Sequence, residues 1–234
     1  MTVLVGLRCC DGAVLACDSQ ETRSNYFRFW PKVHTIEKGF VVLGAGNPTI
    51  IEAFARRFTL RFSEAGNEEK IDRTNAIQLI ENCLFDLGKE AGEDAVKGRQ
   101  LLIAGTMDDS DLCLWAVDSD EIYVREMRTW ECYGSGIDAA EMLMKDFYYP
   151  EVSTAEAIPL LAYVVQAVSD ICLDCGGPIS VVVASAKGIK QLPHREVESS
   201  LSEVKTLLDR LRKEFPRRVL KSEPAIIEEV RKYE

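Results

Sequence analysis

The order of strand and helix signals is the feature that most constrains how this chain can fold. Residues 3–43 and 100–126 are rich in short apolar and β-branched runs, and each block is followed by two segments with helical periodicity. A last apolar run covers Pro178–Ser185. Helix pairs that follow strand blocks pack on the outer faces of sheets. The sequence therefore predicts an α+β fold, a four-layer α-β-β-α sandwich of two antiparallel sheets with a C-terminal helical extension.

The strand signals are clearest near the N-terminus, where they predict two hairpins. Asp11-Gly12 is a favoured hairpin turn, and Ser19–Arg28 is polar and is predicted to be a loop. The strands predicted here and in the second block are Val3–Leu7, Ala13–Cys17, Val33–Ile36, Gly39–Leu43, Gln100–Gly105, Leu112–Val117 and Glu121–Glu126.

The helix signals include start signals as well as periodicity. Pro48 favours a first helical turn, and Ser153 with Glu156 forms a capping-box pattern. The predicted helices run from Pro48 to about Arg61, from Asp72 to Ala91, from Asp138 to Phe147 and from Ser153 to about Cys172. The first of them carries more apolar residues than one core face needs, which predicts a further contact surface at Ile50, Ile51, Phe54, Phe58 and Phe62.

The composition changes beyond Glu196. Val197 to Phe215 shows one apolar face on a charged helix, Pro216 ends it, and a final short helix is predicted over Ile226–Tyr233. We expect one domain over residues 1–194 and a helical tail over residues 195–234. The tail either packs on its own domain or contacts another subunit, and the sequence leaves both open.

The charge balance excludes several classes of function. Lys and Arg number 28 against 38 Asp and Glu, which gives a net charge of -10, and no Lys/Arg-rich run forms a basic patch. Nucleic-acid binding is therefore not expected. No segment has the length of a transmembrane helix, and the N-terminus lacks a signal-peptide layout, so we expect no membrane association and a cytoplasmic location.

The eight cysteines do not form a disulfide framework by their placement. Cys172 and Cys175 make one C-x-x-C, which is typical of a redox pair or of half a zinc site. No second C-x-x-C exists, and the two histidines, His34 and His194, are distant in sequence, so zinc is not expected. Reduced thiols are the simplest interpretation.

Thr2 is the first candidate for chemistry, because it directly follows Met1. Removal of Met1 leaves a threonine whose hydroxyl and free α-amine supply a nucleophile and a base within one residue. Many chains start Met-Thr, so this feature gains weight only in combination with motifs further along the chain.

Four motifs in series strengthen this interpretation. They are Thr2 to Asp18, Pro31-Lys-Val-His-Thr-Ile36, Gly44-Ala-Gly46 before a helix, and Tyr133-Gly-Ser-Gly136 before a helix. In this order and spacing, the chain from Thr2 to about Leu192 resembles the proteasome β-subunit superfamily of N-terminal nucleophile (Ntn) hydrolases. The resemblance implies the Ntn hydrolase fold and threonine-type endopeptidase activity.

The resemblance implies a set of catalytic residues, and elementary chemistry agrees with it. The α-amine of Thr2, with an ordinary pKa of about 7.7–8.0, takes the proton of Oγ. The ammonium group of Lys32 favours the neutral amine, and Asp18 holds Lys32 in place. Gly46 offers a backbone N–H to the oxyanion, and Ser135 hydrogen-bonds the amine. No cofactor is required for this reaction.

The chain departs from the family before its double glycine, Gly176-Gly177. The family commonly has Asp and Ser where this sequence has Cys172 and Cys175. Asp170-Ile-Cys-Leu instead resembles the bacterial heat-shock-locus peptidase, which works with an ATP-dependent unfoldase. That resemblance implies Asp170 as a supporting acid and a structural Na⁺ facing the backbone carbonyls of Ser169, Cys172 and Cys175.

The same resemblance assigns substrate contacts. Thr22 is expected to bind the substrate backbone, and the first side-chain pocket is expected to be lined by Glu21, Trp30, Gly44 and Glu52. A small Gly44 beside an acidic Glu52 suggests room for a basic substrate side chain.

Three functions remain open. The first is a threonine endopeptidase that acts on polypeptides inside a homo-oligomeric ring, using Thr2 after removal of Met1. The second is a non-catalytic ring scaffold of the same fold. The third is a dedicated amidase or peptide ligase, because an acyl-enzyme reacts with water or with an amine.

Overall fold

The computed structural model describes residues 2–23, 26–36, 39–68, 71–107, 111–120, 122–210 and 213. Met1, the end of the predicted tail helix at Phe215 and the predicted helix Ile226–Tyr233 lie outside the described residues. Within them, no helix combines the length and apolarity that crossing a membrane requires.

Among the described residues, two five-stranded antiparallel sheets form the centre of the fold. The first sheet has the order β10-β1-β2-β11-β12, from Trp130–Gly134, Val3–Cys9, Gly12–Cys17, Ser180–Ser185 and Gly188–Gln191. The second has the order β5-β6-β7-β8-β9, from Val33–Ile36, Phe40–Ala45, Gln100–Met107, Asp111–Asp118 and Tyr123–Glu126. The prediction of a mixed fold with antiparallel sheets is thus confirmed.

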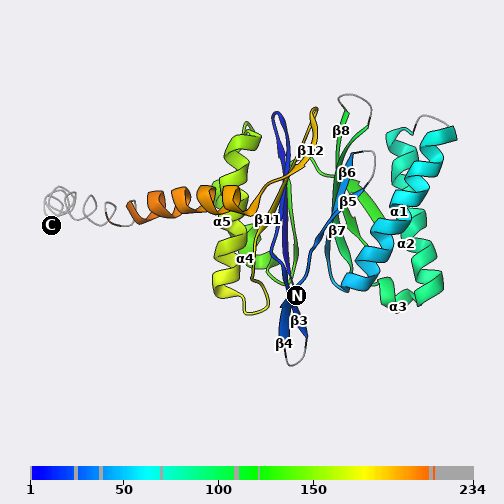
Figure 1. Cartoon of the computed structure of the whole chain (residues 1–234), viewed down its shortest axis with the longest axis horizontal. Helices are drawn as coiled ribbons and strands as arrows, with labels where there is room; N and C mark the ends of the chain where they lie inside the picture. Colours follow the sequence, from blue (N-terminus) through cyan, green and yellow to red (C-terminus); the bar gives the residue numbers. More distant parts are fainter. Residues whose placement is uncertain are drawn as a thin grey trace, which may run out of the picture.

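Helices lie on the outer side of each sheet. Figure 1 shows α4 and α5 against the first sheet, and α1 and α2 against the second, with the two sheets between them. The bounds are α1 (Pro48–Glu68), α2 (Arg73–Ala91), α3 (Glu93–Val96), α4 (Ile137–Phe147) and α5 (Thr154–Ile171). A further helix covers residues 194–210.

In the part of the chain that the structure describes, three apolar clusters hold these elements together. Strand alternation explains how one strand contributes to two of them. Val3 and Val5 of β1 pack with residues of α5, whereas Leu4 between them packs with the second sheet. The third cluster lies between the second sheet and helices α1 and α2. Its aromatic centre includes Phe40, Phe54, Phe58 and Trp115.

The structure corrects the sequence prediction in several places. Residues Ser19–Arg28 are not a plain loop, because Gln20–Arg23 (β3) and Tyr26–Phe29 (β4) pair as a two-stranded antiparallel hairpin. It projects beyond the two sheets, near the N-terminus (Figure 1). The strand β12 and the short helix α3 were not predicted, and α1 extends to Glu68.

The predicted contact surface on α1 is also wrong. Ile51, Phe54, Phe58 and Phe62 are buried in the cluster between α1 and the second sheet. Only Ile50 of the predicted set is half-buried. Helix α1 packs against both β6 and α2. Its apolar face is therefore wide, and these residues lie on it.

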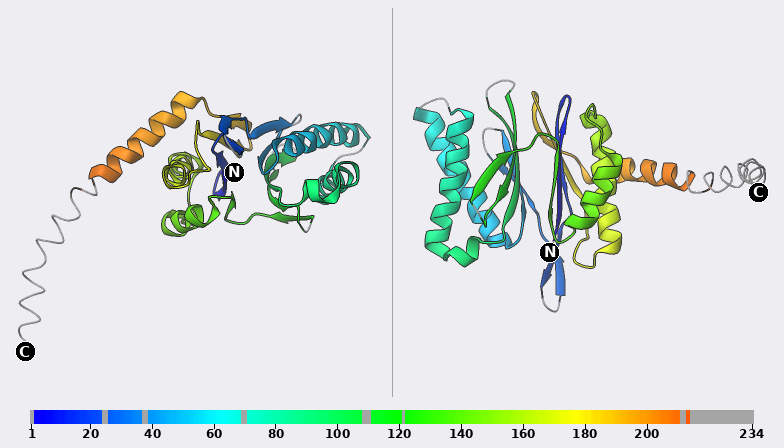
Figure 2. Two further views of the ribbon diagram at one scale, coloured as in Figure 1. Left: turned by 90° about the horizontal axis from the view of Figure 1, so that it is seen from below. Right: turned by 180° about the vertical axis from the view of Figure 1, so that it is seen from behind.

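The helix over residues 194–210 begins on the domain and then leaves it. Val197 and Leu201 are buried in the cluster around α5, whereas Leu207 is 54% exposed. Figure 2 shows this helix, in orange, projecting away from the sheets and their helices. Both expectations for the tail therefore stay open, since Val197 and Leu201 pack on their own domain and Leu207, in a later turn, is exposed.

Candidate active site

Thr2 directly precedes β1 and is 4% exposed. Its backbone nitrogen donates to Oγ of Ser135 at 3.1 Å, and its carbonyl accepts from that hydroxyl and from the N–H of Gly136, both at 3.3 Å. The next N–H, of Val3, donates to Oδ1 of Asp18 at 2.9 Å. Thr2 is therefore held between the end of β2 and the turn that joins β10 to α4.

That turn requires glycine for a steric reason. Gly134 has φ +95°, and a Cβ at this position would lie 2.1 Å from the carbonyl oxygen of Thr2. Its N–H donates to Oε1 of Gln100 at 3.0 Å, which links the turn to β7 of the second sheet. The close approach of Gly134 to Thr2 is thus built into the packing of both sheets.

Asp18 is the fully buried centre of the polar network. Its Oδ1 accepts from Val3 and, at 2.6 Å, from Nζ of Lys32, while Oδ2 accepts from the N–H groups of Gln20 at 3.1 Å and Gly176 at 3.0 Å. Buried carboxylates need such compensation. Lys32 is 8% exposed, so the pair is a buried ion pair.

The segment between α5 and β11 forms one wall of this network. The carbonyl of Gly176 accepts from the backbone N–H groups of Ser19 and Gln20, at 3.1 and 2.9 Å. Sγ of Cys175 lies 3.8 Å from Oγ of Ser135. Sequence reasoning missed both contacts, and the adjacent C-x-x-C and double glycine were the only signals for them.

A pocket opens beside Thr2. It is lined by Thr2, Gln20, Glu21, Trp30, Pro31, Lys32, His34, Gly44, Gly46, Pro48 and Ile51. Gly46 lies between β6 and α1 with φ +118°, a conformation that glycine adopts freely. The structure therefore brings Thr2, Lys32 and Gly46 to one cavity, next to the Asp18 network.

The predicted substrate-pocket residues lie only partly at this cavity. Glu21, Trp30 and Gly44 line it, but Glu52 is exposed and does not. Ile51 lines it instead, and a Cβ on Gly44 would lie 2.4 Å from Cγ2 of Ile51. Burial lowers the pKa of the nearby His34, and the charge of Glu52 opposes that shift.

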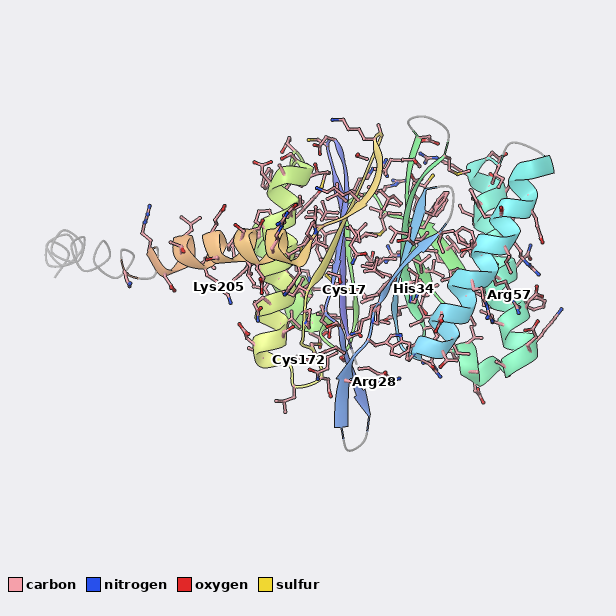
Figure 3. The ribbon with its side chains drawn as sticks, viewed as in Figure 1. Cys17, Arg28, His34, Arg57, Cys172 and Lys205 are labelled. Atoms are coloured by element: carbon pink, nitrogen blue, oxygen red, sulfur yellow. The ribbon has the colours of Figure 1, made fainter. Side chains whose placement is uncertain are left out.

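Glu21 and Trp30 share one neighbour. Nε of Arg28 donates to Oε2 of Glu21 at 2.5 Å, and the guanidinium lies 4.6 Å from the centre of the Trp30 ring. Figure 3 places Arg28 and Cys172 at the same end of the molecule, which is the end where the N-terminus lies in Figure 1. Thr22 lies in β3, and its side chain is outside what the structure describes.

Asp170 is not brought to Thr2. It is exposed on α5, and its Oδ1 accepts from Nε2 of Gln166 at 2.7 Å. Val168 is buried toward the first sheet, and two residues along a helix turn the side chain by about 200°. The expected role of Asp170 as supporting acid therefore lacks geometric support.

The expected cation site stays a prediction. Of its three carbonyls, that of Cys172 accepts from the N–H of Cys175 at 3.0 Å and so closes a turn. Ser169 uses its hydroxyl to donate to the carbonyl of Val165. Among the residues that the structure describes, no cluster of three or more His, Cys, Asp or Glu side chains is placed to hold a metal ion.

Comparisons with known proteins identify the family of this chain. A family model described as "Proteasome subunit" matches residues 2–184. The chain is 23% identical over 198 residues to proteasome subunit beta of Nanoarchaeum equitans, covering 82% of this chain and 97% of the relative. It is 26% identical to rat proteasome subunit beta type-10 over 195 residues, covering 81% and 67%. It is 23% identical to proteasome subunit beta 1 of Thermococcus kodakarensis over 202 residues, covering 86% and 96%. The chain belongs to the proteasome subunit family.

Proposed function

We propose that this protein is a threonine-type endopeptidase whose nucleophile is Oγ of Thr2, once the residue before Thr2 is removed. The observation that carries the proposal is the buried Lys32–Asp18 ion pair at the pocket that Thr2 also lines. A buried charge pair costs desolvation, so its place beside a hydroxyl is more consistent with chemistry than with stability.

The reaction follows the acyl-transfer pattern of activated nucleophiles. The α-amine of Thr2 takes the proton from Oγ, and Oγ attacks the substrate carbonyl carbon. The N–H of Gly46 stabilises the oxyanion, and the amine passes its proton to the leaving nitrogen as the C–N bond breaks. Water then attacks the ester, releases the acid and restores Oγ–H. Ser135 orients the amine, since its Oγ already accepts from that nitrogen.

Lys32 acts through its charge in this scheme. Its ammonium favours the neutral α-amine and stabilises the developing alkoxide. Asp18 holds that ammonium in place with a 2.6 Å contact, and its remaining acceptor positions bind backbone donors around Thr2. Loss of Lys32 therefore removes the positive charge near the nucleophile. It also leaves the buried Asp18 carboxylate without its cation.

The pocket beside Thr2 is proposed to receive the substrate side chain on the acyl side of the cleaved bond. Ile51 occupies the space over Gly44, so the depth of the pocket is set by Ile51 rather than by Glu52. Thr22 on β3 is proposed to pair with the substrate backbone as an edge strand does.

The proposal includes a four-layer fold and a ring assembly. The Ntn hydrolase sandwich of four layers is supported by the three apolar clusters and by the arrangement in Figure 1. A homo-oligomeric ring in the cytoplasm, served by an ATP-dependent unfoldase as in the bacterial heat-shock-locus peptidase, is supported by membership of the family and by the Asp170-Ile-Cys-Leu sequence.

Two measurements test the proposal. Peptide-coumarin hydrolysis by the wild type and by Thr2→Ala tests the nucleophile, and mass photometry of both tests the ring. We expect hydrolysis only in the wild type and the same assembled mass in both. An assembled but inactive wild type supports the scaffold alternative, and a monomer that transfers its acyl group to an added amine supports the ligase alternative.

A further inference from the structure

The two cysteines of the C-x-x-C form a closed turn. The N–H of Cys175 donates to the carbonyl of Cys172 at 3.0 Å. A four-residue turn of this kind brings its end Cα atoms within about 7 Å. A disulfide needs about 4.4–6.8 Å between Cα atoms. The turn therefore brings the two Cα atoms into the range of separations that a disulfide can span.

The two thiols differ in access to solvent. Cys172 is half-buried, and Leu173 next to it is 96% exposed, so the tip of the turn faces solvent. Cys175 is 3% exposed. A reagent in solution therefore meets Cys172 first, and Cys175 is placed as the second thiol.

The turn also contacts the groups that hold Thr2. Sγ of Cys175 lies 3.8 Å from Oγ of Ser135, the hydroxyl that accepts from the Thr2 nitrogen. The N–H of Gly176, one residue on, donates to Asp18. Nε2 of Gln20 donates to the carbonyl of Leu173 at 2.9 Å. A change in the turn thus reaches the Ser135 hydroxyl and the Asp18 carboxylate directly.

We propose that Cys172 and Cys175 are a redox-modification site whose reagent is a low-molecular-weight disulfide, and that its oxidation reversibly slows acyl transfer at Thr2. The effect on rate rests on the function proposed above. The modification itself does not.

The exchange balances as two thiol–disulfide steps. The Cys172 thiolate attacks one sulfur of the reagent disulfide, forms a mixed disulfide and releases one thiolate, which takes up a proton. The Cys175 sulfur then attacks the Cys172 sulfur, the bond to the reagent breaks, and the departing reagent thiolate takes up the proton that Cys175 gives up. The two cysteines are oxidised and the reagent is reduced to two thiols, so an added dithiol reverses the reaction.

Oxidation changes the hydrogen-bond contact between Sγ of Cys175 and Oγ of Ser135. A disulfide sets the two sulfurs about 2.05 Å apart, which removes the thiol hydrogen and draws Sγ toward Cys172. Ser135 then loses a hydrogen-bonding neighbour, and the N–H of Gly176 moves relative to Asp18. We expect the rate of acyl transfer to fall by about fivefold, the scale of one lost hydrogen bond.

The experiment uses the purified chain with oxidised glutathione, followed by dithiothreitol. Peptide mapping is expected to show the loss of two hydrogen atoms in the peptide that contains residues 172–175, with hydrolysis lowered and then restored. Each variant is compared with its own reduced form. The ratio of oxidised to reduced rate is expected to be near one for Cys172→Ser. The matched control Cys10→Ser removes an exposed cysteine of the β1–β2 turn and is expected to keep the wild-type ratio.

Hydrogen exchange separates this inference from the proposed function. Oxidation is expected to speed amide exchange in the peptides that cover residues 18–20 and 175–176, whether or not the protein hydrolyses peptides. If the reduced protein is inactive, the peptidase proposal fails. Peptide mapping of the disulfide and hydrogen exchange then still test whether Cys172 and Cys175 are a redox-modification site. The inference is overturned if no disulfide forms or if the disulfide joins other cysteines. It is also overturned if the oxidised form shows the same amide exchange as the reduced form.

Discussion

Nζ of Lys32 lies 2.6 Å from Oδ1 of Asp18, and the two side chains are 8% and 0% exposed. The same oxygen accepts from the N–H of Val3, the residue after Thr2. One carboxylate therefore positions both the nucleophile strand and the ammonium beside it. This connection makes the polar network sensitive to changes at either residue.

Replacing Lys32 tests that connection. Lys32→Ala leaves the Asp18 charge buried without its cation, and breaking a buried pair costs about 3–5 kcal/mol of unfolding free energy. We expect kcat/KM for a peptide-coumarin substrate to fall more than tenfold, that is by more than about 1.4 kcal/mol of barrier. Lys190→Ala is the matched control, because Lys190 is an exposed lysine that pairs with Glu196. A rate above about a tenth of wild type in Lys32→Ala would show that Lys32 has no part in the chemistry.

Gly134 and Gly188 form a natural comparison. Both have positive φ, but a Cβ on Gly134 meets the Thr2 carbonyl at 2.1 Å, whereas one on Gly188 meets nothing within 4 Å. Gly188→Ala should cost only backbone strain, about 1–2 kcal/mol. Gly134→Ala should cost more and should also displace Thr2, so hydrolysis should fall along with the urea midpoint. Equal effects on stability in the two variants would argue against the close approach.

The side-chain pocket predicts a change of specificity at Ile51. Ile51→Ala opens the space over Gly44, so kcat/KM should shift toward substrates with larger side chains before the cleaved bond. Glu52→Gln, one residue on, should leave the preference nearly unchanged because Glu52 does not line the pocket. A panel of peptide-coumarin substrates measures both. A preference that changes only in Glu52→Gln supports an acidic pocket instead.

Stability should depend on pH through buried thiols. Burial raises the pKa of Cys17 to about 12 from an ordinary value of 9.0. In the unfolded chain this thiol ionises from about pH 9, so its stabilising contribution is complete below pH 9 and is lost as pH rises toward 12. Between pH 9 and pH 12, the unfolding free energy of Cys17→Ala should therefore fall less steeply with pH than that of the wild type. The two slopes should differ by about 1.4 kcal/mol per pH unit.

Val14→Ala is the control for that measurement, because Val14 is a buried residue of the same strand without a titratable group. It should lower the unfolding free energy by the same amount at every pH. Urea unfolding between pH 8 and pH 10.5 gives the slopes. Parallel slopes for wild type and Cys17→Ala would contradict the role of burial.

The proximity of Thr2 and Asp18 could be predicted because it depends on local pairing, whereas the place of Lys32 was implied by the family resemblance of residues 31–36. Thr2 and Asp18 lie at the open ends of one hairpin whose turn, Asp11-Gly12, has a clear signal. Strand alternation then sets which side chains share a face. The two antiparallel sheets follow from the same signals.

The sequence predictions that were wrong concern which side of a helix a residue faces, and a hairpin with weak strand signals. Asp170 and Glu52 each lie within a turn of a residue that does face the core or the pocket, and a change of one or two residues rotates a side chain by about 100–200°. Where α5 ends and how α1 sits over Gly44 depend on tertiary packing. The hairpin of β3 and β4 was missed because polar residues hid a short pairing pattern.

The reaction of Thr2 with a peptide epoxyketone tests the central claim most directly. That reagent requires a hydroxyl and a free α-amine on one residue, and intact mass followed by peptide mapping locates the adduct. The account predicts one adduct per chain, on a protein that begins at Thr2, and none in Thr2→Ala. A fully active enzyme that retains Met1, or that forms no adduct at Thr2, would contradict it.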